Sequence, residues 1–488
     1  MSKFNMSQKG INTTTNLAGG KAYVVGDKEK LVNMVLTTLF KEPKFYGDTS
    51  SEIVDTTKRV IDADAKFVAN LAVYAREVMH LRSISQALAV ELSQSKKGKE
   101  FARKVINKVT ERVDDMTEIM AYQISAYKKP IPNSLKKGIR DTFSKFDEYA
   151  LAKYNRAKVV TLKDILCLVH PKPLNVEQEK IWKRLIEGNL EVPKTWETEL
   201  SAKGNKKEVW EELIREKKIG YMAALRNLRN ISQSGASNID DVLNYIQNPA
   251  AIAKSKQLPF RFFSAYKELE MVDQGNKVIN AISNALDTAV ANLPKLYGKT
   301  FMICDNSGSM DSNKLSRNSK VSCKDVGTLF MAIAEGFCEE ATTSVFGDTF
   351  AIVNVLSKDS VFSKMKAFAS KDVGCCTNLW AALEYIVSKK IYTDRIIVFT
   401  DEQCYNSGGY GWGRGMTAQQ YFEKYLREIN SDCKLHIINL NAQDGTTQFL
   451  GRNVNYISGW SEKIFEFIPI FESGEGNLVE AIDSYYFK

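Results

Sequence analysis

A carboxylate and two hydroxyl groups are concentrated in one short turn of the sequence. Asp305, Ser307 and Ser309 lie within the run DNSGSM, which directly follows the apolar segment 301–304. That segment is typical of a buried strand, so the turn is expected at the carboxyl end of the strand. Hard oxygen donors crowded into one tight turn indicate a site for a divalent cation.

Two more oxygen donors complete this candidate site. Asp401 follows the apolar run 396–399, and Thr377 precedes a predicted helix. Neighbouring parallel strands end at the same edge of a sheet, so we expect these side chains to meet. The combined set has a formal charge of −2 and consists of Asp305, Ser307, Ser309, Thr377 and Asp401. It favours Mg²⁺, with Mn²⁺ or Ca²⁺ as alternatives, over zinc or copper.

A simpler interpretation is that the serine-rich turn only caps a helix. Capping explains one serine, but neither the second hydroxyl nor both strand-end aspartates. The pattern resembles the metal-ion-dependent adhesion site of von Willebrand factor A domains, in which an Asp-x-Ser-x-Ser turn is joined by a distant Thr and a distant Asp. The resemblance covers residues 294–488. It implies that all five residues are metal ligands.

Two enzyme interpretations compete with a binding site, and both fail. Gly298-Lys299-Thr300 is similar to the end of a phosphate-binding loop, but Leu293 stands where that loop needs a glycine. The turn after Asp305 could also be an aspartyl-phosphate site, but Ser307 stands where a second aspartate would be expected. A metal-dependent phosphohydrolase is therefore the weakest hypothesis, and we expect no enzymatic activity.

The size and composition are those of an ordinary globular protein. A chain of 488 residues, 44% apolar and 26% charged, has room for two or three domains. No segment is long and apolar enough to span a bilayer, so no membrane association is expected. Residues 1–20 lack the apolar core of a signal peptide and are expected to form a disordered lead-in. Eight cysteines without zinc-finger spacing favour a reduced, cytoplasmic protein.

Charge is distributed unevenly along the chain. Residues 1–300 contain 49 Lys and Arg against 35 Asp and Glu, an excess of 14 positive charges. Residues 301–488 contain 18 against 23, an excess of five negative charges. A basic first part indicates a polyanionic partner such as nucleic acid. The alternative is a lysine-rich surface that serves solubility.

The periodicity of apolar residues changes near Pro294. Residues 27–292 have helical spacing, and prolines such as Pro249 and Pro259 separate short helices, which is typical of a HEAT-like helical repeat. After residue 294, short apolar runs alternate with predicted helices at 325–339, 378–389 and 418–429. This alternation predicts a parallel sheet that helices cover on both faces, as in a Rossmann-like doubly wound domain. We therefore predict a multidomain chain: lead-in 1–20, all-α domain 21–293 and α/β domain 294–488.

Three stretches of the helical part resemble the TROVE domain of the Ro ribonucleoprotein family. The most specific is Tyr221–Asn230 (YMAALRNLRN), followed by Leu258–Tyr266 (LPFRFFSAY). The third begins at Lys153-Tyr154 and continues through Lys163–Leu166 to His170–Pro173 (HPKP). A helical domain followed by an A domain is the Ro architecture. The resemblance therefore covers the chain after about residue 20.

The resemblance implies a monomeric ring of HEAT-like helices whose ends are brought together by the A domain. It also implies binding of single-stranded 3′ ends of misfolded non-coding RNA in the ring cavity, and of structured Y-like RNA on the basic outer surface. Bacterial members are associated with exoribonuclease partners, and this chain is identified as a bacterial or phage member. Nothing in the sequence points to DNA specificity.

The family's outer RNA-binding stretch places a basic residue at Lys153 and an imidazole at His170, with Lys172 two residues later. Another basic family position falls on Ala157, and the flanking Arg156 and Lys158 can substitute for it. For His170 the alternative is a packing residue that ends a helix before Pro171.

Arg226 and Arg229 share a helix face at i and i+3, where a guanidinium pair can grip phosphates and stack on bases. The alternative for both arginines is a hydrogen-bonding role between repeats.

The glycine-rich loop 408–415 (GGYGWGRG) follows Asp401 closely. Its Tyr410, Trp412 and Arg414 are suited to contact RNA or a protein partner, and the alternative is a mobile surface loop. Our leading hypothesis is thus an RNA-binding protein of the Ro type that acts in quality control of non-coding RNA. The second is a protein-assembly module whose metal site captures an acidic side chain of a partner.

Overall fold

The structure is a computed structural model, and it describes 13–16, 20–24, 26–36, 51–128, 130–155, 159–255, 257, 259–270, 275–291, 293, 295–314, 321–402, 404–405, 415–441, 446–458, 465, 467–474 and 477–485. These residues fold into two compact units. The helical unit comprises residues 27–209 and 479–488, and the mixed unit comprises residues 1–26 and 210–478. Within the described residues, no helix combines the length and apolar character needed to cross a membrane.

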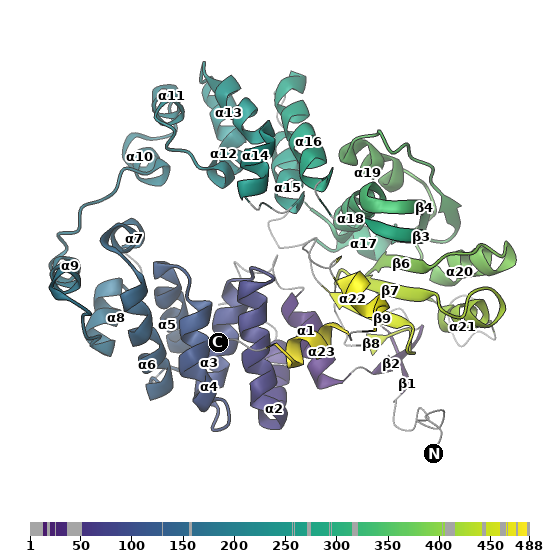
Figure 1. The fold of residues 1–488 in the computed structure, drawn as a ribbon, viewed down its shortest axis with the longest axis horizontal. Helices are drawn as coiled ribbons and strands as arrows, with labels where there is room; N and C mark the ends of the chain where they lie inside the picture. Colours follow the sequence, from purple (N-terminus) through teal and green to yellow (C-terminus); the bar gives the residue numbers. More distant parts are fainter. Residues whose placement is uncertain are drawn as a thin grey trace. The chain divides into compact units, whose positions relative to one another are not determined.

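Nearly all helices of the helical unit lie side by side, and the last one in sequence stands apart from them (Figure 1). The helices are α1 (Asp27–Leu36), α2 (Ser51–Glu77), α3 (Ser83–Gln94), α4 (Lys99–Val109), α5 (Val113–Tyr127), α6 (Asn133–Thr142), the 3-10 turn η3 (Phe143–Lys145), α7 (Glu148–Tyr154), α8 (Leu162–Val169), α9 (Val176–Glu187) and α10 (Trp196–Lys203). Side-chain caps start several of them: Asp147, Thr161 and Asn175 accept hydrogen bonds from the first turns of α7, α8 and α9. The predicted all-α organisation is confirmed, and ring closure stays a prediction.

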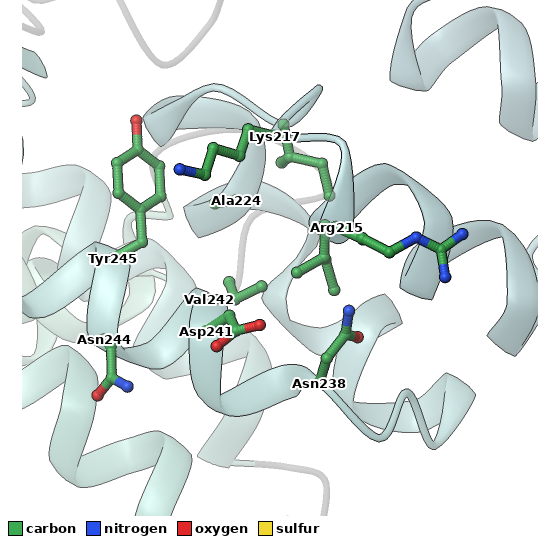
Figure 2. A pocket seen from close by; sticks show the side chains of 10 residues that line it. Arg215, Lys217, Ala224, Asn238, Asp241, Val242, Asn244 and Tyr245 are labelled. Atoms are coloured by element: carbon green, nitrogen blue, oxygen red, sulfur yellow. The ribbon is translucent and has the colours of Figure 1, made fainter.

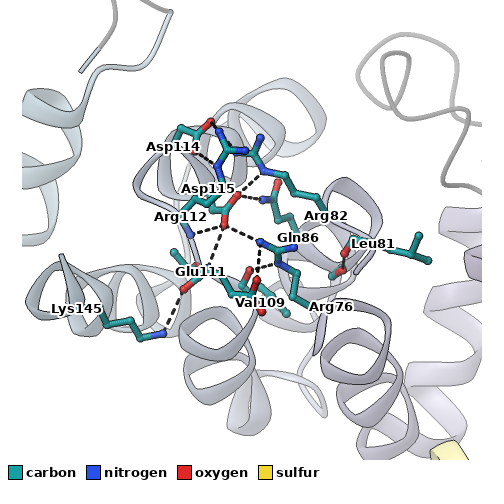
Figure 3. Close-up of polar contacts among 12 residues, drawn as sticks. Arg76, Leu81, Arg82, Gln86, Val109, Glu111, Arg112, Asp114, Asp115 and Lys145 are labelled. Carbon is teal, nitrogen blue, oxygen red and sulfur yellow. Dashed lines mark hydrogen bonds and ion pairs between the residues drawn. The ribbon is translucent and has the colours of Figure 1, made fainter. Parts of the chain in front are cut away.

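A buried ion-pair cluster joins the helices of this unit (Figure 3). At its centre is the fully buried Asp115 carboxylate, which accepts hydrogen bonds from Arg76, Arg82 and Gln86 and from the backbone N–H of Arg112. These donors come from α2, from the residue that precedes α3, from α3 and from the N-cap of α5. Several donors on one carboxylate offset much of the cost of burying its charge.

The mixed unit contains the remaining helices and both sheets. Two helices cross the division between the units: α11 (Lys207–Arg215) and α23 (Leu478–Asp483). The other helices are α12 (Tyr221–Ser234), α13 (Ile239–Gln247), α14 (Pro249–Ser255), α15 (Pro259–Glu270), α16 (Gly275–Ala291), α17 (Gly308–Ser312), α18 (Cys323–Phe337), α19 (Val361–Ala369), α20 (Leu379–Ser388), α21 (Ala418–Glu428) and α22 (Phe467–Glu472). Pro249 and Pro259 begin α14 and α15, where a missing N–H costs nothing.

The larger sheet has six strands in the order β5-β4-β3-β6-β7-β9. Its strands are β3 (Leu296–Asp305), β4 (Cys338–Phe346), β5 (Phe350–Ile352), β6 (Arg395–Thr400), β7 (Lys434–Asn439) and β9 (Val454–Ser458). All neighbours are parallel except β4 and β5. The apolar runs predicted β3, β6 and β7 correctly. The prediction of a parallel sheet is wrong at one edge, where β5 is antiparallel to β4.

Helices cover both faces of this sheet (Figure 1). On one face, Phe301 and Ile396 pack in a core with α20 and α21. On the other, α18 approaches so closely that a Cβ on Gly327 would lie 3.0 Å from the Sγ of Cys304. The predicted α/β arrangement is therefore confirmed.

The change from helices to sheet falls between α16 and β3, near Pro294, whereas the compact units divide after Val209.

The helix predicted for 325–339 is confirmed as α18, although it ends at Phe337, and Cys338 and Glu339 belong to β4. One prediction for an individual segment is wrong. Part of the lead-in predicted to be disordered is a strand, β1 (Thr13–Thr15), which pairs with β2 (Lys21–Val24). The second strand pairs in turn with β8 (Thr446–Thr447), so the hairpin is attached to a segment that is distant in sequence.

Candidate metal centre and nucleic-acid interface

Asp305 is the last residue of β3, and its carboxylate is held in a fixed orientation. Its side chain is fully buried. The backbone N–H of Ser307 donates to Oδ1 at 2.9 Å, and the hydroxyl of Thr400, at the end of β6, donates to Oδ2 at 2.8 Å. Two donors on separate oxygens leave this carboxylate little freedom, which preorganises it for a ligand.

The structure brings the predicted donors to one edge of the sheet. β3 and β6 are parallel neighbours, so Asp305 and Asp401 emerge side by side. The Oγ atoms of Ser307 and Ser309 are 3.1 Å apart. The backbone N–H of Gly308 donates to the carbonyl of Cys375 at 2.9 Å, which fixes the loop that carries Thr377 beside the serine turn. Metal binding by these five residues stays a prediction.

The electrostatics of this edge suit a cation. Burial and the neighbouring charge of Asp401 raise the pKa of Asp305 to about 7. The hydrogen bonds from Ser307 and Thr400 lower this pKa, but by less than the other two effects raise it. Two buried carboxylates repel each other unless a positive charge lies between them. Two carboxylates with hydroxyl groups are donors that suit a hard ion which keeps water ligands. Among the described residues, no cluster of three or more His, Cys, Asp or Glu could hold a metal.

Sequence reasoning missed the residues that support the loop after Asp401. The side chain of Asn16 donates to the carbonyls of Glu402, at 3.1 Å, and Cys404, at 2.9 Å. Glu402 is buried with a left-handed backbone (φ 60°), and its carboxylate accepts from Asn439 at 2.8 Å. No local pattern could identify Asn16, because its partners lie almost the whole chain away.

The proposed outer RNA-binding residues are exposed or partly exposed. Lys153 lies in the last turn of α7, with its ammonium 5.6 Å from the ring centroid of Tyr154. His170 ends α8 in a left-handed conformation (φ 45°), and both His170 and Lys172 are at least partly exposed. The packing role considered for His170 does not fit this exposure. Arg156 and Lys158 lie outside the described residues.

Arg226 and Arg229 differ in their surroundings. Both lie on α12, whose opposite side buries Leu225, Leu228 and Ile231 as the spacing predicts. Arg229 forms an ion pair with Glu268 of α15 at 2.6 Å. This contact matches the alternative considered from the sequence, a hydrogen-bonding role between helices. Arg226 is exposed. The three aromatic and basic residues of the glycine-rich loop, Tyr410, Trp412 and Arg414, lie outside the described residues.

A sequence model of the TROVE domain matches residues 28–188 and 183–325 of the chain. The chain belongs to the TROVE-domain (Ro) family. TROVE proteins are RNA-binding components of ribonucleoproteins and are generally not enzymes. The matched residues include Lys153, His170, Lys172, Arg226 and Arg229, and they continue through β3 to the serine turn.

Curated relatives and a solved structure agree with this assignment. Telomerase protein component 1 of Mus musculus is 23% identical over 311 residues, and that of Rattus norvegicus is 25% identical over 313 residues. Each match covers 46% of this chain and spans only 12% of the relative's length. The crystal structure of the Ro (RSR) protein of Deinococcus radiodurans superposes with a TM-score of 0.66 over 92% of this chain and 100% of that one. At 15% identity, this likeness establishes a shared fold.

Proposed function

We propose that this TROVE protein binds structured, Y-like non-coding RNA and the single-stranded ends of misfolded RNA, and acts in RNA quality control within a ribonucleoprotein. The observation that carries the proposal is the TROVE match, which coincides with the part of the chain that has the large excess of Lys and Arg. Cations on such a surface displace counterions from RNA phosphates, which drives binding with little dependence on sequence.

The exposed side chains suit two different modes of contact. Lys153, His170 and Lys172 lie at the ends of α7 and α8, where they can reach phosphates of a folded RNA. Arg226 offers a planar guanidinium that can pair with a phosphate or stack on an unpaired base. Sequencing the RNA that co-purifies with the protein tests the proposal. Enrichment of small structured RNA and truncated RNA is expected, and recovery of bulk cellular RNA without enrichment would contradict it.

We further infer that the sheet of the mixed unit is a von Willebrand factor A-type domain with a Mg²⁺ site. Asp305, Ser307, Ser309, Thr377 and Asp401 would hold the ion. Support comes from the convergence of their loops and from the buried pair of carboxylates. When bound, Mg²⁺ supplies an open coordination position for an acidic side chain. Such a site would recruit a partner, for example an exoribonuclease.

This second role makes a separable prediction. Asp305→Ala should abolish Mg²⁺-dependent partner binding and leave RNA affinity unchanged, because the proposed RNA contacts lie on the helices. We propose no catalysis at this site. Turnover of phosphoester substrates with Mg²⁺ or Mn²⁺ would contradict the absence of catalysis. A partner complex that survives removal of the metal would contradict the role of the metal in recruitment.

A further inference from the structure

A cavity of about 820 Å³ lies within the mixed unit, away from the sheet edge (Figure 2). It is built by the end of α11, the connection to α12, the first turn of α12, and α13. This volume is in the range of small-molecule sites. Its walls combine buried apolar side chains, Ile219 and Val242 among them, with polar groups on the rim.

One wall is an aromatic surface held in place from behind. The ring of Tyr245 packs edge-on against Tyr221, with centroids 5.5 Å apart and an interplanar angle of 68°. Tyr221 is itself anchored, because its hydroxyl donates to the carbonyl of Ile246 at 2.6 Å. Tyr245 remains 40% exposed. A fixed and accessible ring is suited to stacking on a planar ligand.

Two hydrogen-bond acceptors lie at another side of the cavity. The side-chain nitrogen of Asn238 donates to the carbonyl of Glu211 at 3.1 Å, which fixes the orientation of the amide. Its Oδ1 is buried and has no hydrogen-bond partner among the described residues. The carboxylate of Asp241, labelled beside it in Figure 2, belongs to the same lining. A buried acceptor without a donor is costly, so this side favours a ligand that brings N–H groups.

Cations stand at the rim. Arg215 and Lys217 are both exposed and both line the cavity. Lys217 has a left-handed backbone (φ 53°) where α11 ends, a conformation that normally selects glycine. The backbone N–H groups of Lys217 and Lys218 donate to the carbonyls of Ile214 and Leu213, so Lys217 closes the end of α11 beside the cavity. Figure 2 shows its ammonium group directed toward the side formed by Tyr245.

We propose that this cavity binds a guanine nucleotide. The base stacks on Tyr245, its N1–H and N2–H groups donate to Asp241 and Asn238, and its phosphate pairs with Lys217. Guanine fits best because its adjacent N–H donors match a carboxylate, whereas adenine presents an acceptor at N1. The nucleotide is either free or a residue of bound RNA. The inference rests on the cavity's own chemistry and goes beyond the proposed RNA-binding function.

Calorimetric titration of the full chain with GMP tests the inference. Saturable binding at a single site is expected, with guanosine and AMP each weaker by about tenfold, because each lacks one set of interactions. Lys217→Gln and Asp241→Asn should each weaken GMP binding by about tenfold. Lys218→Gln is the matched control: Lys218 is exposed and adjacent, but it does not line the cavity. These surface changes leave the packed core intact.

Two results would overturn the inference: no saturable heat with GMP up to about 1 mM, or equal losses in Lys217→Gln and Lys218→Gln. Competition by short RNA oligonucleotides then identifies the source of the nucleotide. If a guanosine-containing oligonucleotide displaces GMP and a guanosine-free one does not, the ligand is a residue of RNA. If neither displaces it, the ligand is a free nucleotide. Failure to bind GMP would leave the RNA-binding function standing.

Discussion

The backbone N–H of Gly308 donates a 2.9 Å hydrogen bond to the carbonyl oxygen of Cys375. This single contact joins the serine turn after β3 to the loop that precedes α20. It therefore holds the serine turn beside the loop that carries Thr377. A backbone contact of this kind reduces the freedom of both loops, so less of the chain has to be ordered when a cation binds.

We expect Mg²⁺ to raise the melting temperature of the protein. A ligand that binds only the folded state stabilises it by about 2.7 kcal/mol at 100 times its dissociation constant. Asp305→Asn removes one of the two ligand charges and should abolish most of this increase. Asp311→Asn is the control, because the side chain of Asp311 is 69% exposed on α17. Thermal melts with and without MgCl₂ check the prediction, and an equal increase in both variants would refute it.

Loss of the Asp115 carboxylate should destabilise the helical unit strongly. Asp115→Ala leaves Arg76, whose side chain is only 7% exposed, and Arg82 without their central partner. Removing one member of a buried ion cluster costs about 3–5 kcal/mol. Asp141→Ala, which breaks the exposed pair with Arg103, should cost less than about 1 kcal/mol. Urea denaturation measures the free energy of unfolding of both variants. Similar losses in the two variants would show that the buried cluster contributes no more than an exposed ion pair.

Stability should depend on pH through Glu472. Burial alone would raise its pKa, but hydrogen bonds from His436 and Arg395 lower it from the usual 4.5 to about 2. Arg395 forms a bidentate pair with it, at 2.7 and 3.0 Å. Burial also lowers the pKa of His436, so the imidazole is neutral at pH 7.

A lowered folded-state pKa contributes stability above pH 4.5 that is lost as the pH falls toward 2. The contribution is at most about 3 kcal/mol. In urea denaturation at a series of pH values, the gap between Glu472→Gln and the unmodified chain should narrow over that interval. Glu428→Gln, which affects an exposed pair with Arg427, should show no such trend. A gap that stays constant as the pH falls across that interval would contradict the assignment.

Lys153 and Lys172 should each contribute to binding of structured RNA. Removing one phosphate contact lowers the slope of log affinity against log salt by about 0.9 for a duplex. We therefore expect the double variant Lys153→Gln/Lys172→Gln to bind more weakly and with less dependence on salt. Lys183→Gln, 77% exposed on α9, is the control. An equal decrease in the control would indicate diffuse charge instead of a site.

Local patterns predicted the elements whose burial is continuous. The runs at 301–304 and 396–399 became β3 and β6, and their positions identified the edge where Asp305 and Asp401 meet. β4 was missed because its first half is largely exposed and carries Glu339 and Glu340, so no apolar run indicates it.

The N-terminal strands were missed for a different reason, since they depend on contacts with distant segments. A Cβ on Gly20 would lie 2.1 Å from the carbonyl oxygen of Cys404, so the hairpin fits only with glycine there. Asn16 supports the same loop. The cavity beside α11 was likewise invisible, because Lys217, Asn238 and Tyr245 meet only after the helices pack. Sequence periodicity defines elements, whereas packing between distant elements defines most of the site.

The most direct test of the central claim is equilibrium filter binding of single-stranded RNA to the full chain between about 50 and 200 mM salt. We predict a measurable affinity whose logarithm falls linearly with the logarithm of the salt concentration, because phosphate contacts by Lys and Arg release counterions. Absence of binding at the low-salt end, or an affinity that does not change across the series, would contradict it.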